Sequence, residues 1–302
     1  MRIAPAGDRA QLVTFDEIIA AELHARAREW RAREGVLAVV PGHSSLLVVF
    51  GVARVGAPEV AGGAVHQVAV SFAPSHAPDL EALLARIHLS RDAFIERVAR
   101  LRLTARFLGF RAGFAYLDGW PEEWSMPRRP TSRPVPHGSF AIAGATAGFY
   151  PIDSPGGWNL LGRTNALPRI AAGDEVTIVP TLDEIDVAPL PAPPREQLEG
   201  VEILSGPLAT VVRGAEDWSR VVHGEPPGGA FDDVAAALAN RAAGNAEDAP
   251  LLECAMTAPR LRTSRAAVWC GPDLEVRPFA EIGRIEGGLR GYAAFGSRSG
   301  NS

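Results

Sequence analysis

A dense run of glycine, proline and aromatic residues between Arg106 and Thr164 limits what this chain can fold into. Proline lacks a backbone donor and glycine loses the most conformational entropy on ordering, so a long helix through this run is disfavoured. Short strands joined by tight turns remain. Arginines recur along the run, and Gly156 and Gly157 leave backbone amides open to close approach by a ligand. We therefore predict that residues 106–164 close on themselves as a set of strands and present guanidinium groups and glycine amides to a small anion.

Periodic hydrophobic patterns predict regular elements on both sides of this run. In the N-terminal part they predict strands over 11–15, 36–40 and 46–50 around a helix over 17–33. That order is typical of a small α+β domain of split βαβ character. The next predicted elements are a strand over 65–72, a helix over 79–88 and a helix from 91 with Ser90 as its N-cap.

The C-terminal third contains one clear helix signal, in which Asp232 is a good N-cap for residues 233–243. Val234 and Leu238 are one turn apart and are expected on its buried face. The proline-rich segment 190–195 precedes this part and predicts an extended, semi-rigid linker.

The central run carries an ordered series of short motifs: Leu108-Gly109-Phe110, Gly113-Phe114, Tyr116-Leu117, Pro127-Arg128, Val135-Pro136, Gly138-Ser139, Ile142-Ala143-Gly144, Tyr150-Pro151, Ser154-Pro155-Gly156-Gly157-Trp158 and Leu161-Gly162-Arg163-Thr164. This series resembles the family that includes the B subunit of 5-oxoprolinase, allophanate hydrolase subunit 1 and the Kip-type inhibitor of a sporulation histidine kinase. The resemblance implies a ferredoxin-like α+β N-terminal domain followed by a cyclophilin-like β barrel.

A second series follows the linker: Val201-Glu202-Ile203-Leu204, Asp217, Gly229-Ala230, Asp232, Ala239-Asn240-Arg241 and Leu252-Glu253. It resembles the start of the C subunit of 5-oxoprolinase, so the order implies a fusion of B-type and C-type subunits that is shortened at its C-terminus. The expected class is α+β, mainly β, with a partial second cyclophilin-like domain. The expected domains are 1–62, 63–185, a linker over 186–199, and 200–302.

Charge and composition exclude several classes of function. The net charge is -5 and the pI is near 5.8, which argues against a general nucleic-acid binder. No apolar run approaches the roughly 18 to 20 residues of a membrane span, and the N-terminus lacks a secretory apolar core, so a cytoplasmic protein is expected. All 30 basic residues are arginine, which excludes a Schiff-base lysine, a Walker-type loop and a biotinylated lysine in this chain. Cys254 and Cys270 are expected to be buried, and no metal site is predicted.

The resemblance implies ATP-dependent opening of a lactam, 5-oxo-L-proline, to L-glutamate, with the amide oxygen phosphorylated before water attacks. Such a site needs cations and amides against anionic oxygens, together with a carboxylate near the water. Candidate catalytic carboxylates are Asp153, Asp118 and Asp232. Candidate binding groups are Arg128, Arg129, Arg163, Ser154, Gly156, Gly157 and Trp158.

Plain structural roles are open alternatives for the same residues. The glycines equally fit tight turns, and the arginines equally fit salt bridges to Glu122 and Glu123. His43, in a predicted turn, is expected to be an exposed residue without a catalytic role. Phe110, Phe114, Tyr116 and Tyr150 are expected in the barrel core, whereas Trp158 could flank a ligand.

The expected partner is an A-type subunit of 5-oxoprolinase that shares the ATP, and a homo-oligomer is also compatible with the sequence. One alternative function is a biotin-dependent carboxyltransferase acting on urea or a related amide, or an allophanate-hydrolase-type domain. The other is a non-catalytic, Kip-type inhibitor of a histidine kinase. The chain has Ala112 and Ala115 where the family has prolines, and the usual polar run before that motif reads Val98-Ala99-Arg100-Leu101. Barrel-forming residues are thus kept better than polar ones.

Overall fold

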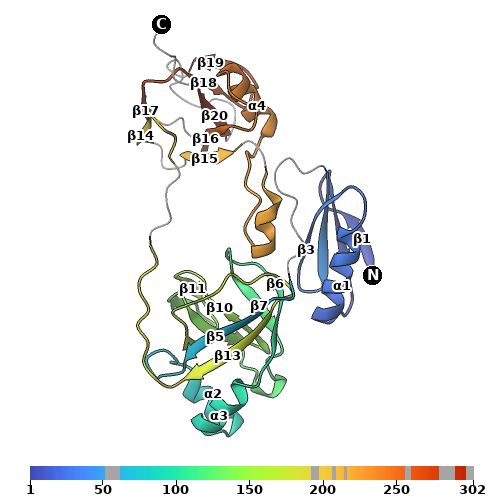
Figure 1. Ribbon diagram of the computed structural model, residues 1–302, viewed down its shortest axis with the longest axis vertical. Helices are drawn as coiled ribbons and strands as arrows, with labels where there is room; N and C mark the ends of the chain where they lie inside the picture. The colour runs from blue at the N-terminus through green and yellow to red at the C-terminus, as the bar shows by residue number, and fades with distance from the viewer. Residues whose placement is uncertain are drawn as a thin grey trace. The chain divides into compact units, whose positions relative to one another are not determined.

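The computed structural model describes residues 1–51, 62–191, 197–205, 209–213, 216–255, 260–278 and 290–296. The chain divides into two compact units (Figure 1). The first contains Met1–Pro191 together with Trp218–Pro226, and the second contains Ala192–Asp217 and Pro227–Ser302. Residues 192–195 of the predicted proline-rich linker lie outside the described residues, and the predicted domain boundaries stay predictions.

The N-terminal part of the first unit is a four-stranded antiparallel sheet with one helix. The sheet order is β1-β2-β4-β3, and the elements are β1 (Arg2–Pro5), β2 (Ala10–Thr14), α1 (Ala20–Arg31), β3 (Val36–Pro41) and β4 (Ser45–Phe50). Leu23 and Trp30 of α1 pack with Val13, Leu46 and Val48 of the sheet. The helix and three strands predicted here are confirmed, whereas β1 was not predicted.

A closed seven-stranded barrel follows, with the order β10-β7-β6-β13-β5-β12-β9 (Figure 1). Its strands are β5 (Val65–Ser71), β6 (Leu103–Leu108), β7 (Ala115–Asp118), β9 (Ser139–Ala143), β10 (Thr146–Phe149), β12 (Asn159–Arg163) and β13 (Glu175–Thr181). A separate two-stranded sheet pairs β8 (Arg133–Val135) with β11 (Ser154–Gly156). The expected mainly β, α+β class with a barrel is confirmed.

The barrel closes through strands outside the central run, which corrects the prediction that residues 106–164 close on themselves. β5 and β13 pair in parallel from Val65↔Glu175 to Ser71↔Thr181, and they join β12 to β6. The central run supplies only part of the strand order, because its hairpins leave two edges that need partners. The run also contains one 3₁₀ turn, η1 (Glu122–Trp124).

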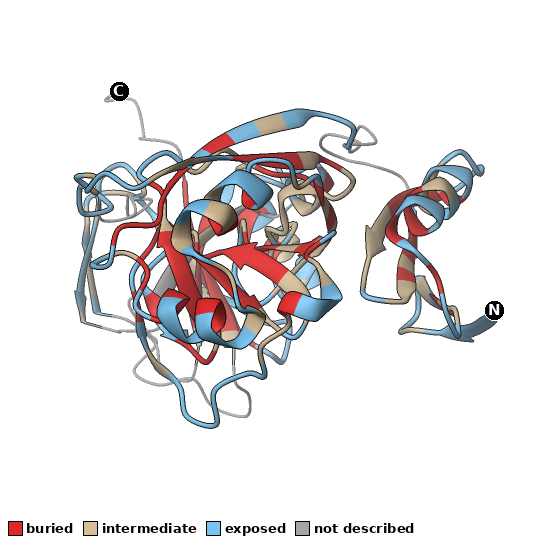
Figure 2. Cartoon of the chain, turned by 90° about the horizontal axis from the view of Figure 1, so that it is seen from below, coloured by how far each residue is buried: buried red, intermediate tan, exposed pale blue. Residues whose placement is uncertain are grey.

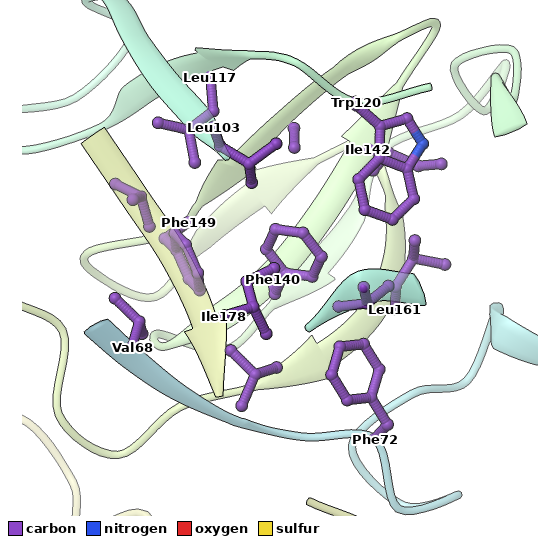
Figure 3. Packing of buried hydrophobic residues seen from close by; sticks show 14 of the residues in the cluster. Val68, Phe72, Leu103, Leu117, Trp120, Phe140, Ile142, Phe149, Leu161 and Ile178 are labelled. Carbon is purple, nitrogen blue, oxygen red and sulfur yellow. The ribbon is translucent and has the colours of Figure 1, made fainter. Parts of the chain in front are cut away.

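Side chains fill the interior of the barrel. Figure 3 shows Phe140, Phe149 and Ile178 converging between the strands, with Phe72, Leu161 and Val68 beside them. All of these side chains are at most 2% exposed. The side chains of this barrel fill its interior. A binding site on the barrel would therefore lie at its rim or on its outer face.

Two helices, α2 (Leu80–Ile87) and α3 (Arg91–Val98), pack on the barrel. Seen from below, they show a buried side and an exposed side (Figure 2). The Ser90 hydroxyl accepts a hydrogen bond from the Ala93 amide at 3.2 Å, which confirms the predicted N-cap.

A short segment, which we call the arm (Trp218–Pro226), belongs to the first unit although both of its flanks belong to the second. It contains the 3₁₀ helix η2 (Trp218–His223). Trp218 is buried against Leu37, Ala38 and Val49, on the side of the N-terminal sheet opposite α1's core cluster. The arm therefore covers an apolar sheet face, a contact that no local sequence pattern predicts.

The described residues of the second unit form two sheets and one helix. A five-stranded sheet has the order β15-β16-β20-β18-β19, and β14 pairs with β17. The elements are β14 (Val201–Ser205), β15 (Ala209–Arg213), α4 (Asp233–Ala242), β16 (Pro250–Ala255), β17 (Arg260–Thr263), β18 (Ala267–Cys270), β19 (Val276–Pro278) and β20 (Arg290–Phe295).

Helix α4 begins at the predicted cap but buries a different face. Asp232 Oδ1 accepts a hydrogen bond from the Ala235 amide at 2.9 Å. Val234 is 55% exposed, so its predicted burial is wrong, whereas Leu238 is partly buried and packs on the cluster that contains Ala235, Ala236 and Ala239. Small side chains let a helix lie close to a sheet, which explains this choice of face.

Candidate functional site

The aromatic residues of the central run form a cluster on the outer face of the barrel, apart from its core. Along β7, Leu117 points into the core while its neighbour Tyr116 joins Phe114, Tyr150 and Trp158 outside. Strand alternation requires this division, because successive side chains point to opposite faces. Val135 of β8 packs into the same outer cluster, so the β8–β11 sheet covers part of it.

The rings of this cluster meet edge to face. Phe114 lies at the centre, with ring centroids 5.0 Å from Tyr116, 5.3 Å from Tyr150 and 5.4 Å from Trp158. Phe110 touches Phe114 and Tyr150 but is 56% exposed and has a φ of 67°. Its predicted place in the barrel core is therefore wrong. A positive φ at a bulky residue is strained, and it turns this ring out of the chain's hydrophobic interior.

Gly156 and Gly157 make space for two polar side chains of this cluster. A Cβ on Gly156 would overlap the Tyr150 hydroxyl, and a Cβ on Gly157 would lie 2.9 Å from Arg128 Nε. The phenol and the guanidinium therefore lie against consecutive residues of one backbone segment. Trp158 follows directly, and its ring centroid is 5.7 Å from that of Tyr116. We call Arg128, Tyr116, Tyr150 and Trp158 the arginine–tyrosine cluster.

The backbone on both sides of Arg128 is fixed by neighbouring strands. Asn159 Nδ2 donates to the Pro127 carbonyl at 3.0 Å, and the Arg129 amide donates to the Gly157 carbonyl at 2.8 Å. Yet the exposed guanidinium of Arg128 has no hydrogen-bond or carboxylate partner within the described parts of the chain. It is a well-positioned cation with free donors.

The two neighbouring arginines are bound differently. Arg129 Nη1 lies 3.3 Å from Asp79 Oδ1, and Arg133 Nη2 contacts Asp79 Oδ2. Asp79 is only 8% exposed, and its Oδ2 also accepts from the Leu160 amide at 2.7 Å. The salt bridges to Glu122 and Glu123 considered above are not among the contacts of the described residues. Asp79 therefore leaves Arg128 as the unneutralised arginine of the three.

A groove of about 560 Å³ runs along the β8–β11 sheet, lined by Ser132, Arg133, Pro134, Val135, Pro136, Asp153, Ser154 and Pro155. Two polar atoms of this lining are buried without a hydrogen-bond partner in the described structure, namely Ser154 Oγ and Arg133 Nε. Unsatisfied buried groups of this kind are uncommon, because each loses its hydration.

At one end of the groove, Asp153 binds His137. The Asp153 Oδ1 atom accepts from the His137 amide at 2.7 Å and lies 2.9 Å from its ring Nδ1. These hydrogen bonds from His137 lower the pKa of the Asp153 carboxyl, so it stays ionised at neutral pH. Arg163 Nε donates to the His137 carbonyl at 3.0 Å, which brings Arg163 to the same corner.

The structure thus brings some predicted site residues together and separates others. Arg128, Gly156, Gly157 and Trp158 form one group, and Asp153, Ser154 and Arg163 lie along or beside the groove.

Two predicted carboxylates lie elsewhere. Asp118 lies 2.6 Å from Arg106 Nη1, and that arginine also binds the Ile18 and His43 carbonyls. Asp232 caps α4 in the second unit. Asp118 and Asp232 therefore have structural partners of their own, and their catalytic roles stay predictions without support from the geometry.

Four residues of this region were not predicted from the sequence as functional groups: Asp79, His137, Tyr116 and Tyr150. The tyrosines were assigned to the core, because an aromatic residue in a strand is usually buried. Asp79 follows a proline and precedes a helix, which resembles an ordinary cap. Only the fold shows that it neutralises two arginines.

Among the described residues, no group of three or more His, Cys, Asp or Glu side chains is placed to hold a metal ion. Both cysteines are buried, as predicted, and burial raises the pKa of Cys254 to about 12 and that of Cys270 to about 11. No helix in the described ranges has the length and apolar character needed to cross a membrane.

Comparison with known proteins assigns both halves to one family. The model for subdomains C and D of the carboxyltransferase domain matches residues 1–168, and the model for subdomains A and B matches residues 223–278. The chain is 35% identical to the 5-oxoprolinase B subunit of Escherichia coli O157:H7 over 124 residues, which are 41% of this chain and 57% of that protein.

A second relative, the 5-oxoprolinase B subunit of Haemophilus influenzae, is 55% identical over 62 residues, or 20% of this chain and 29% of that protein. The chain therefore spans about half or less of the curated relatives it matches. The crystal structure of TTHA0988 superposes with a TM-score of 0.73 at 28% identity, covering 95% of this chain and 68% of that one.

Proposed function

The chain belongs to the carboxyltransferase-domain family, and from this membership we propose that it acts as the fused B/C-type component of an ATP-dependent 5-oxoprolinase. The assembly would convert 5-oxo-L-proline to L-glutamate with an A-type partner protein. The observation that carries the proposal is the 124-residue match to the B subunit of 5-oxoprolinase. The free guanidinium of Arg128 beside an aromatic cluster supports it, since the substrate is a small cyclic acid.

The proposed reaction adds water across the lactam C–N bond. The oxygen of one water joins the carbonyl carbon and the nitrogen leaves as the amine of glutamate, while a second water is consumed as ATP is converted to ADP and phosphate. In this chain Arg128 would hold the anionic group of the substrate. Asp153, kept ionised by His137 and 73% exposed at its side chain, would accept the proton from water.

The donor set of the described residues does not fit the triphosphate of ATP. Arg129 and Arg133 are neutralised by Asp79, Arg163 binds the His137 carbonyl, and the chain has no lysine. A triphosphate is normally held by several cations and a metal ion. We therefore expect the A-type partner to hold most of the nucleotide.

The test is ATP-dependent release of glutamate from 5-oxo-L-proline by the full chain co-purified with an A-type partner. Arg128→Gln should lower kcat/KM about tenfold or more, because it removes a charge-assisted hydrogen bond to the substrate. Arg97→Gln, an exposed arginine of α3, is the matched control and should leave turnover unchanged. A purified complex that binds ATP but releases no glutamate would exclude this function.

The family match also favours a second candidate, a biotin-dependent carboxyltransferase for urea or a related amide, since both matched models describe carboxyltransferase subdomains. Because the chain lacks lysine, the biotin would be carried by another protein. Urea-dependent decarboxylation of carboxybiotin by the full chain, without glutamate formation from 5-oxoproline, would select this alternative.

A further inference from the structure

Two tyrosines and one arginine lie against the Gly156–Trp158 segment. The Tyr150 hydroxyl rests on Gly156, the Arg128 guanidinium rests on Gly157, and the Tyr116 ring packs on Trp158. Among the described residues, the Tyr116 hydroxyl makes no hydrogen bond and no carboxylate pairs with the Arg128 guanidinium. The cluster therefore offers donors and lacks an acceptor.

The protonation states of these groups fit that role. Burial raises the pKa of the Tyr116 phenol against a lowering effect of Arg128. Burial likewise raises the pKa of the Tyr150 phenol, against lowering effects of its backbone hydrogen bond with Trp158 and of Arg128. Both phenols consequently remain protonated at neutral pH and can donate, while an arginine is always charged.

The accessible side of the cluster is aromatic. Phe114 and Tyr150 are buried at 1% and 2% exposed, whereas Tyr116 and Trp158 are only partly buried. A ligand that packs on the Tyr116 and Trp158 rings beside Arg128 has an apolar edge. The guanidinium fork favours a planar carboxylate, which it can bind through two parallel N–H groups.

We propose that the arginine–tyrosine cluster is the binding site for the carboxylate of a small cyclic acid, with Arg128 and Tyr116 as direct ligands and the buried Tyr150 supporting the Gly156–Trp158 segment behind them. Arg128 binds the carboxylate, the Tyr116 hydroxyl donates to a carboxylate or ring-carbonyl oxygen, and Trp158 packs on the ring. The identity of the acid as 5-oxo-L-proline rests on the proposed function. The site itself, as a carboxylate site, does not.

The chain contains three tyrosines, and this makes a direct test possible. The full chain is labelled with 3-fluorotyrosine and titrated with 5-oxo-L-proline while ¹⁹F NMR signals are followed. Tyr116 and Tyr150 should shift together on binding, whereas Tyr292 in the second unit, bound to Glu253, serves as the internal reference. Tyr116→Phe assigns its signal and is expected to keep the fold, since no protein hydrogen bond is lost.

The ligand series separates carboxylate recognition from other chemistries. 2-Pyrrolidinone has the same ring without the carboxylate, acetate has the carboxylate without the ring, and inorganic phosphate is the competing anion. We expect 5-oxo-L-proline to bind about tenfold or more tightly than 2-pyrrolidinone, with phosphate weaker than 5-oxo-L-proline. Arg128→Gln should remove that advantage and leave 2-pyrrolidinone binding unchanged, whereas Arg97→Gln should change neither.

Each outcome decides the proposal. Three results would overturn it. They are equal affinities for 5-oxo-L-proline and 2-pyrrolidinone, normal binding of 5-oxo-L-proline by Arg128→Gln, and no shift of the two tyrosine signals at millimolar ligand. Tighter binding of phosphate than of either carboxylate would make the cluster a phosphate site and would also overturn it. Carboxylate binding that depends on Arg128, in a complex that releases no glutamate, would sustain this site and exclude the 5-oxoprolinase function.

Discussion

Two buried serines near the β8–β11 sheet differ in how their hydroxyls are satisfied. Ser139 Oγ donates to the Pro136 carbonyl at 2.7 Å, whereas Ser154 Oγ is buried without a hydrogen-bond partner in the described structure. Both side chains are at least nine-tenths buried. A hydroxyl that loses its hydration without gaining a hydrogen bond destabilises the folded state.

Ser154→Ala should therefore raise the free energy of unfolding by about 1 kcal/mol, because it removes the unsatisfied hydroxyl. Ser139→Ala, the matched control, should lower it by about 1 kcal/mol, since the Pro136 carbonyl loses its donor. Urea denaturation of the full chain, followed by tryptophan fluorescence, measures both. If Ser154→Ala were as destabilising as Ser139→Ala, its hydroxyl would have a partner in solution.

The arginines illustrate how far residue identity alone can lead. Arg128, Arg129 and Arg163 were equivalent candidates in the sequence, and either binding or salt bridging suited each of them. Asp79, some fifty residues earlier, distinguishes them by engaging Arg129 and the unselected Arg133. No local pattern predicts a contact over that separation, because it depends on how α2 packs against β12.

The arm (Trp218–Pro226) makes contacts that arise only in the folded chain. Trp218 is 9% exposed against the sheet of β3 and β4. At the other end of the arm, the Gly113 amide donates to the His223 carbonyl at 3.0 Å and Arg169 Nη2 lies 2.7 Å from Glu225 Oε1. The arm therefore contacts both the N-terminal sheet and the barrel of the first unit.

Trp218→Ala should cost about 3 kcal/mol or more of unfolding free energy, because it leaves a cavity on an apolar sheet face. Val234→Ala, which truncates an exposed apolar side chain of α4, is the control and should change stability by less than about 0.5 kcal/mol. Differential scanning calorimetry of the two full-length variants makes the comparison. Equal transition temperatures would mean that the arm does not contribute to the first unit.

Local elements were predicted where the signal is short-range. Ser90 and Asp232 both cap the helices they were expected to cap, because a cap depends on three or four successive residues. Val234 was placed on the wrong face, since a periodic pattern rich in alanine does not show which side meets the sheet.

Across the first unit as a whole, the N-terminal domain is linked to the barrel by a buried histidine. His24 of α1 lies with Nε2 3.1 Å from the Ala105 carbonyl of β6. Burial lowers the pKa of its imidazole and outweighs the raising effect of the hydrogen bond to the Ala105 carbonyl. Protonation of this buried imidazole therefore destabilises the folded state.

The unfolded chain binds a proton at His24 more readily than the folded chain, so stability rises with pH across this titration. The contribution of neutral His24 to the free energy of unfolding is fully present above the pKa of the unfolded chain, about 6.5. It is lost as the pH falls through the lower pKa of the folded chain. Urea unfolding between about pH 5 and pH 8 measures this slope. His24→Gln should flatten it, whereas His43→Gln, at an exposed turn, should not; equal slopes in both variants would assign the effect elsewhere.

Neighbouring residues and ordered motifs were enough to define the order and type of most elements, the N-caps of α3 and α4, and the family. Three features instead depend on the folded chain: β5 and β13 close the barrel, Tyr116 faces outward while Leu117 faces inward, and Asp79 leaves Arg128 free. Alternation in a strand defines two faces without saying which is inside, and that choice is made by contacts between residues far apart in the chain.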